Sequence, residues 1–82
     1  MRIDQFLKKT YLSKQRGTAK ELCDHRFIKI NGQFCKPSKQ VRMGDVIEME
    51  TVSGMKQYVV LAIPGGNVKK SESVLYYREK GG

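Results

Sequence analysis

The chain has 82 residues, enough for one domain with a small core, which excludes an active-site cleft of ordinary depth. Lys and Arg number 16 against 8 Asp and Glu, so the net charge of +8 favours a polyanion or an acidic membrane surface as partner. Residues 1–40 hold ten basic and three acidic side chains, against six and five in residues 41–82, so we expect the binding surface in the first half. No apolar run is long enough to span a membrane and the start lacks a signal-peptide core, so we expect a cytoplasmic protein with no membrane partner.

The first residues predict an amphipathic helix. Its apolar positions recur at helical spacing and form a stripe that packs on the next helix: Ile3, Phe6, Leu7, Thr10 and Tyr11. Asp4 can pair with Lys8 one turn later. Arg2, Lys8 and Lys9 lie off the stripe, so Arg2 can join a cationic surface shared with the second helix.

A second amphipathic helix is predicted to run up to Asp24, with Ser13 as a plausible N-cap. One face carries three apolar positions: Ala19, Leu22 and Cys23. Arg16 and Lys20 sit one turn apart on another face, so one side of this helix packs and the other is cationic.

A β-hairpin follows the second helix, because the apolar period changes from 3.6 to 2 and Asn31-Gly32 suits a type I′ turn. A two-residue loop pairs Ile30 with Gln33, Lys29 with Phe34, Ile28 with Cys35, and Phe27 with Lys36. This register turns Ile28, Ile30 and Cys35 inward and sets Lys29, Lys36, Phe27 and Phe34 outward. Cations beside aromatic rings suit phosphates and splayed bases, whereas the alternative is a solvated basic face with both rings partly in the core.

The rest of the chain predicts a basic loop at residues 36–40, two paired strands and a short helix. Pro37 prevents a central strand in the loop. The strand at residues 46–51 alternates apolar residues with Glu48 and Glu50, which indicates an acidic back face turned away from nucleic acid. It should pair with residues 56–63, and residues 71–80 should form the helix. We therefore expect a binding domain at residues 1–63 and a linker with a short helical tail at residues 64–82.

No cofactor, metal site or catalytic residue is predicted. Cys23 and Cys35 are too few and too far apart in sequence for a zinc site, so we interpret both as small core residues that can lie near each other. His25 lacks a Cys or His partner at ligand or catalytic spacing and is expected to interact with carbonyls at the end of the helix.

Several stretches together resemble the S-four-type RNA-binding domain, also called the αL motif. They are residues 1–7, Lys14-x-Arg16, residues 19–21, residues 28–32, residues 36–38 and the segment from Val41 to Ile47. The resemblance implies an α+β fold with two N-terminal helices packed on a small, mostly antiparallel sheet of β-hairpins and a short C-terminal helix. Because the chain is hardly longer than the domain, it is most similar to the stand-alone members, the RqcP-like ribosome-associated quality-control factors and the small ribosome-associated heat-shock proteins.

The resemblance implies binding to ribosomal RNA and tRNA on large ribosomal subunits that carry stalled peptidyl-tRNA. Such a factor supports nascent-chain tailing by steadying the tRNA, acts as a monomer, and has a tailing factor protein as a candidate partner. The pattern and the resemblance together give these predicted RNA contacts: Arg2, Lys8, Lys9, Lys14, Arg16, Lys20, Arg26, Lys29, Lys36, Ser38 and Lys39.

Three positions depart from the family pattern. Gln15 replaces a basic residue, Gly17 replaces a hydroxyl or small residue, and His25-Arg26-Phe27 lacks the glycine of a left-handed helix cap. Two other functions stay open: a heat-shock factor that recycles blocked large subunits, and a basic adaptor that docks proteins through residues 71–80. An enzyme is not expected, because the domain leaves no room for a catalytic one and no nucleophile–base pair is present.

Overall fold

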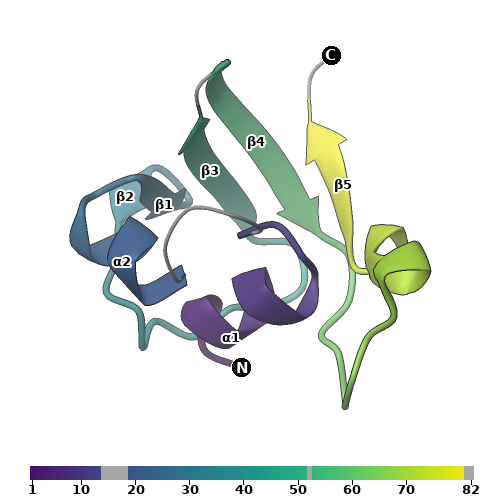
Figure 1. Cartoon of the computed structure of the whole chain (residues 1–82). Helices are drawn as coiled ribbons and strands as arrows, with labels where there is room; N and C mark the ends of the chain where they lie inside the picture. Colours follow the sequence, from purple (N-terminus) through teal and green to yellow (C-terminus); the bar gives the residue numbers. More distant parts are fainter. Residues whose placement is uncertain (14–18, 52, 81–82) are drawn as a thin grey trace.

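Two short helices pack on one face of a five-stranded antiparallel sheet in the computed structural model, which describes residues 1–13, 19–51 and 53–80 (Figure 1). The strand order is β2-β1-β3-β4-β5. The elements are α1 (Ile3–Lys9), α2 (Ala19–Asp24), β1 (Ile28–Ile30), β2 (Gln33–Phe34), β3 (Val46–Thr51), β4 (Gly54–Val60), the 3₁₀ helix η1 (Lys70–Leu75) and β5 (Tyr77–Lys80). The predicted α+β fold with two N-terminal helices on a sheet of hairpins is confirmed.

The core lies between the two helices and the inner face of β1, β3 and β4. The predicted stripe of α1 is buried, with Ile3, Phe6 and Leu7 fully inaccessible to solvent. Thr10 is also buried, and its hydroxyl donates to the carbonyl of Phe6 at 2.7 Å, so no polar atom is left unpaired there. The remaining core residues are Ala19, Cys23, Ile28, Ile30, Val41, Ile47, Met49 and Val60.

The predicted turn of the first hairpin is confirmed. Asn31 and Gly32 both have positive φ, 52° and 84°, which a type I′ turn requires. Lys29 pairs with Phe34 and Ile30 pairs with Gln33, as expected.

The first hairpin is nevertheless shorter than predicted, because β2 ends at Phe34. The predicted strand pairs of Ile28 with Cys35 and Phe27 with Lys36 are therefore wrong. The chain turns away before Pro37, and the amide of Lys39 closes that turn on the carbonyl of Lys36 at 3.0 Å. Only the Sγ of Cys35 still reaches the carbonyl of Ile28, at 3.9 Å.

The hairpin of β3 and β4 forms as predicted, but its acidic face is not the back of the molecule. β1 pairs with β3 as well as with β2, and this register sets Lys29 directly opposite Glu48. Side chains of directly paired residues share one face of a sheet. Glu48 therefore lies on the same outer face as Lys29 and Phe34, so the predicted separation of the acidic and basic faces is wrong.

The helix predicted over residues 71–80 is wrong in its second half. The chain forms η1 and then β5, which pairs with β4 from Gln57–Lys80 to Val60–Tyr77. Tyr77 has a high strand propensity, and the edge of β4 offers unpaired backbone groups. Pairing with the sheet thus prevails over a short helix, which is only marginally stable alone.

Candidate nucleic-acid interface

The start of α1 is anchored to the basic loop at residues 36–40. The amide of Ile3 donates to the carbonyl of Lys39 at 2.7 Å, and the amide of Asp4 donates to that of Pro37 at 3.2 Å. Arg2 forms an isolated antiparallel bridge with Gln40. These bonds satisfy amides at the helix start that have no partner within the helix, and they place Arg2 beside the loop.

Arg2 forms the ion pair that the sequence assigned to Lys8. Its Nη2 and Nε donate to the two carboxylate oxygens of Asp4 at 3.0 and 3.2 Å, so the predicted pairing of Asp4 with Lys8 is wrong. The partners are two positions apart, and the extended backbone of Arg2 before the helix brings its guanidinium back to Asp4. The Arg2 side chain remains 48% exposed, and a guanidinium has five donors, so it can still bind a phosphate.

A shallow hollow of about 400 Å³ lies between the first hairpin and the basic loop. The loop contributes Lys36, Ser38 and Lys39, and the hairpin contributes Phe34 and the turn residue Asn31. Two ammonium groups, one hydroxyl and one exposed ring therefore surround the hollow. This combination suits a phosphate next to a base.

Two cations lie over the ring of Phe34, the exposed aromatic residue of β2. Lys29 Nζ is 4.7 Å from the ring centroid, and Arg26 Cζ is 5.7 Å from it. Both distances allow cation–π attraction. The ring is 52% exposed, so part of it is open for stacking while the two cations are held nearby. We call Arg26, Lys29, Phe34, Lys36, Ser38 and Lys39 the hairpin face.

Arg26 takes the left-handed conformation that the family glycine would adopt. Its φ is 61°, and its amide donates to the carbonyl of Cys23 at 3.1 Å. The next amide, of Phe27, donates to the carbonyl of Leu22 at 2.9 Å. These two bonds form a Schellman motif at the end of α2. The cap geometry is therefore present without a glycine, and an arginine in this position reaches Phe34.

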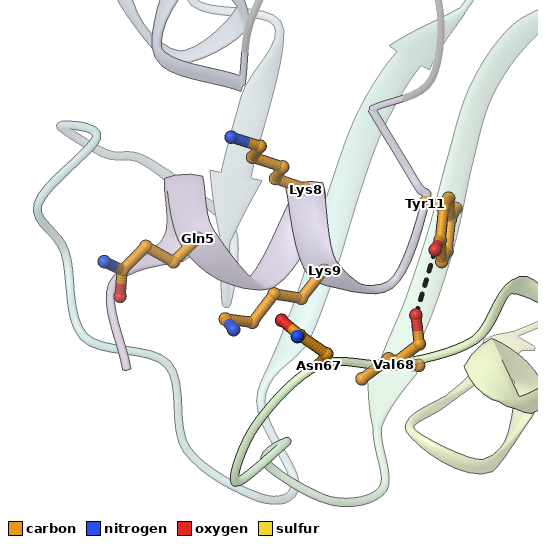
Figure 2. A pocket seen from close by; sticks show the side chains of 6 residues that line it. All are labelled: Gln5, Lys8, Lys9, Tyr11, Asn67 and Val68. Carbon is orange, nitrogen blue, oxygen red and sulfur yellow. Dashed lines mark hydrogen bonds between the residues drawn. The ribbon is translucent and has the colours of Figure 1, made fainter.

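The structure brings together only part of the predicted contact set. The hairpin face gathers five of these residues around Phe34, and Arg2 adjoins its loop. Lys20 is exposed on α2. Lys8 and Lys9 lie at the other end of α1, where Lys9 extends beside Asn67 and Lys8 points to the other side of the helix (Figure 2). Lys14 and Arg16, with Gln15 and Gly17, lie outside the described residues.

Sequence patterns did not predict that the Asp45 side chain fixes the hairpin turn. Asn31 Nδ2 donates to a carboxylate oxygen of Asp45 at 3.2 Å, and Asn31 Oδ1 accepts the amide of Val46 at 2.9 Å. The other Asp45 oxygen accepts the amide of Arg42 at 2.8 Å. Asp45 was visible in the sequence only as part of a Gly-Asp turn, because its contact with Asn31 spans 14 residues.

The two cysteines are neighbouring, neutral thiols. Burial, followed by the proximity of Cys35, raises the pKa of Cys23 to about 12. Burial also raises the pKa of Cys35. Burial therefore favours the protonated, less nucleophilic form of both thiols. In the described ranges, no three acidic, His or Cys side chains gather as a metal site, and no helix is long and apolar enough to cross a membrane.

Comparisons with known proteins agree with this architecture. The family model of the S4 domain matches residues 1–47. The chain is 40% identical over 81 residues to the RQC P-site tRNA stabilizing factor of Helicobacter pylori strain J99. The alignment covers 98% of this chain and 96% of that protein. The alignment thus includes β4, η1 and β5, which lie beyond the matched S4 domain.

Two solved structures resemble the whole chain. The solution structure of the hypothetical protein HP1423 has a TM-score of 0.84 and 36% identity, and the match covers 100% of this chain and 99% of that one. The trimeric structure of Vibrio cholerae heat shock protein 15 has a TM-score of 0.87 and 28% identity, covering 98% of this chain and 81% of that one. The chain therefore belongs to the S4 domain family and, within it, to the RQC P-site tRNA stabilizing factors.

Proposed function

We propose that this protein binds ribosomal RNA and P-site tRNA on large ribosomal subunits that carry stalled peptidyl-tRNA. The observation that carries the proposal is the hairpin face, where Arg26 and Lys29 flank the exposed ring of Phe34 beside the hollow at Lys36 and Ser38. The name of the relatives supplies the biological setting, ribosome-associated quality control, and the tRNA.

The proposed contacts divide into two kinds. Lysine and arginine side chains neutralise phosphates, which provides most of the affinity and makes it depend on salt. The ring of Phe34 stacks on an unpaired base, and the hydroxyl of Ser38 donates to a phosphate or a ribose. We assign the phosphate contacts to Arg2, Lys8, Lys9, Lys14, Arg16, Lys20, Arg26, Lys29, Lys36 and Lys39.

The proposed mechanism is binding without chemistry. A tRNA held at several phosphates loses translational and rotational freedom, so its end stays in place while another factor extends the stalled chain. In this proposal residues 1–63 form the RNA-binding domain, the protein works as a monomer in the cytoplasm, and a tailing factor is its protein partner.

Cosedimentation with purified ribosomal subunits through sucrose gradients tests the proposal. We expect the protein to migrate with large subunits that carry peptidyl-tRNA, and less with large subunits from which the tRNA has been released. The control variant Lys56→Gln/Lys80→Gln, which removes two charges on β4 and β5 that are not part of the hairpin face, should migrate like the wild type. Equal binding to subunits with and without tRNA would contradict direct contact with tRNA, and no binding to either would contradict the proposal.

A further inference from the structure

Two further hollows lie at the opposite end of α1 from Arg2. The first hollow, of about 530 Å³, opens between α1 and the segment after β4 and is lined by Gln5, Lys8, Lys9, Tyr11, Asn67 and Val68 (Figure 2). The second, of about 270 Å³, continues from Tyr11 and Leu12 to Tyr58, Lys70, Tyr77 and Glu79. Because Tyr11 lines both, we call the two together the Tyr11 groove. None of its lining residues belongs to the hairpin face.

Tyr11 is held in place at some conformational cost. Its φ is 62°, a left-handed conformation that bulky residues rarely adopt. Its hydroxyl donates to the carbonyl of Val68 at 2.9 Å, and its side chain is 38% exposed (Figure 2). A glycine would relax this position. The chain instead keeps an aromatic ring between the hollows, and strain of this kind is characteristic of binding sites.

Lysines line both hollows of the Tyr11 groove. Lys9 runs alongside Asn67 and donates to the carbonyl of Gly66 at 3.3 Å, while the ammonium of Lys8 points to the other side of α1 (Figure 2). Lys70 lines the second hollow, and its neighbour Lys69 is exposed. Lysines thus approach Tyr11 from two segments that are about sixty residues apart in sequence.

Two acidic groups near the groove, Glu72 and Glu79, offset part of the charge of Lys9, Lys69 and Lys70. Glu72 accepts the amide of Lys69 at 3.3 Å, so its carboxylate is engaged at the start of η1. Glu79 lines the second hollow, where its charge, after burial, helps to raise the pKa of Tyr58. The Tyr58 hydroxyl stays protonated and can donate a hydrogen bond, and Glu79 can accept one from the N3–H of a uracil base.

The second hollow also offers aromatic walls. The rings of Tyr58 and Tyr77 are in edge-to-face contact, with centroids 5.4 Å apart, and the ring of Tyr11 lies at the entrance. Tyrosines beside lysines provide the two elements of single-strand recognition, which are stacking platforms for bases and cations for the backbone. A purely acidic protein segment would use the lysines but would gain nothing from the rings.

We propose that the Tyr11 groove is a second site for single-stranded nucleic acid, with backbone phosphates at Lys9, Lys69 and Lys70 and a base against the tyrosines. The inference rests on the proposed RNA-binding function but adds residues outside the S4 domain match, which ends at residue 47. Segment 64–70 and β5 then serve binding as well as packing. The site takes unpaired nucleotides, since each base must leave its stack to reach the second hollow.

Backbone amide NMR of the full chain during titration with octauridylate tests the proposal. We expect shifts at Tyr11, Asn67, Val68 and Lys69, together with shifts on the hairpin face. The variant Lys69→Gln/Lys70→Gln should weaken the binding of octauridylate to the groove about tenfold at low salt and abolish the shifts of the groove amides. The shifts on the hairpin face should remain. The matched variant Lys56→Gln/Lys80→Gln should leave both sets of shifts unchanged.

Three results would overturn the groove assignment. They are groove amides that do not move, groove shifts that survive Lys69→Gln/Lys70→Gln, and equal shifts with octaglutamate, which would show a general site for anions or acidic peptides. Loss of the groove shifts alone leaves RNA binding by the hairpin face intact. Absence of shifts on both faces, with no cosedimentation, would instead reject the proposed function together with the groove.

Discussion

Arg26 lies with its guanidinium over the ring of Phe34, 5.7 Å from Cζ to the ring centroid, and it does so from a left-handed backbone position. The end of α2 and the hairpin face are therefore built by the same residue. A glycine would cap the helix with less strain, whereas an arginine supplies a cation beside an exposed ring. This position couples stability to binding.

Arg26→Gly should therefore stabilise the fold and weaken RNA binding. Relief of the left-handed conformation should raise the free energy of unfolding by about 1 kcal/mol, because glycine adopts positive φ without a steric penalty. Loss of the cation should lower affinity for tRNA several-fold. Urea unfolding and fluorescence anisotropy measure the two effects.

Arg26→Ala is the control for this substitution. Alanine removes the cation but keeps a Cβ at positive φ, so binding should weaken as in Arg26→Gly without the gain in stability. If Arg26→Gly bound tRNA as tightly as the wild type, the role of Arg26 in the hairpin face would be wrong.

Phe34→Leu should separate stacking from folding. The ring is 52% exposed, so the free energy of unfolding should change by no more than about 0.5 kcal/mol. Affinity for single-stranded RNA should fall roughly tenfold, because stacking of one base on an aromatic ring contributes about 1–3 kcal/mol. Leu75→Ala, at an apolar residue that is 64% exposed on η1, should affect neither quantity. Unchanged RNA affinity in Phe34→Leu would remove the stacking platform from the account.

Asn31→Asp should destabilise the hairpin, although Asp-Gly is also a favourable type I′ sequence. The new carboxylate would face Asp45, which now accepts a hydrogen bond from Asn31 at 3.2 Å. We expect a loss of about 1–3 kcal/mol at pH 7, from repulsion and the lost donor. The double variant Asn31→Asp/Asp45→Asn reverses the donor and the acceptor, so it should recover most of the stability in urea unfolding. A double variant less stable than Asn31→Asp would show that the pair is not coupled in this way.

Stability should fall at alkaline pH through Cys23. Burial raises the pKa of this thiol from 9.0 to about 12, so the folded chain holds the proton more tightly than the unfolded chain does. The contribution is fully present below pH 9 and is lost progressively between pH 9 and pH 12. Between pH 9 and pH 10.5 the loss should be about 2 kcal/mol.

Cys23→Ala isolates this effect from the titration of exposed lysines. Its stability should be lower than that of the wild type at pH 8 but should fall less steeply up to pH 10.5, as measured by urea unfolding at both pH values. Parallel pH dependence in the two proteins would show that Cys23 is not protonated preferentially in the fold.

The local patterns predicted much of this fold because they depend on neighbouring residues. The stripe of Ile3, Phe6 and Leu7 and the turn at Asn31-Gly32 follow from helical spacing and from turn geometry. The family motifs added the packing of two helices on the sheet, which short-range patterns alone do not specify.

The long-range pairings could not be predicted in the same way. Contact of β1 with β3 places Glu48 beside Lys29, and neither residue carries a local signal of the other. The open edge of β4 converts Tyr77 to Lys80 into a strand that the local pattern placed in a helix. The Tyr11 groove likewise depends on residues 57 positions apart, joined by the hydrogen bond from Tyr11 to Val68.

Salt dependence of RNA affinity tests the central claim, that the hairpin face binds phosphates, most directly. We expect about four to six of the ten assigned cations to contact phosphates at one time, so the slope of log affinity for tRNA against log salt concentration should be about −3 to −5. Lys36→Gln/Lys39→Gln should make this slope shallower by roughly two, whereas Lys56→Gln/Lys80→Gln should leave it unchanged. A flat response in the wild type, or the same change of slope in both double variants, would contradict the claim.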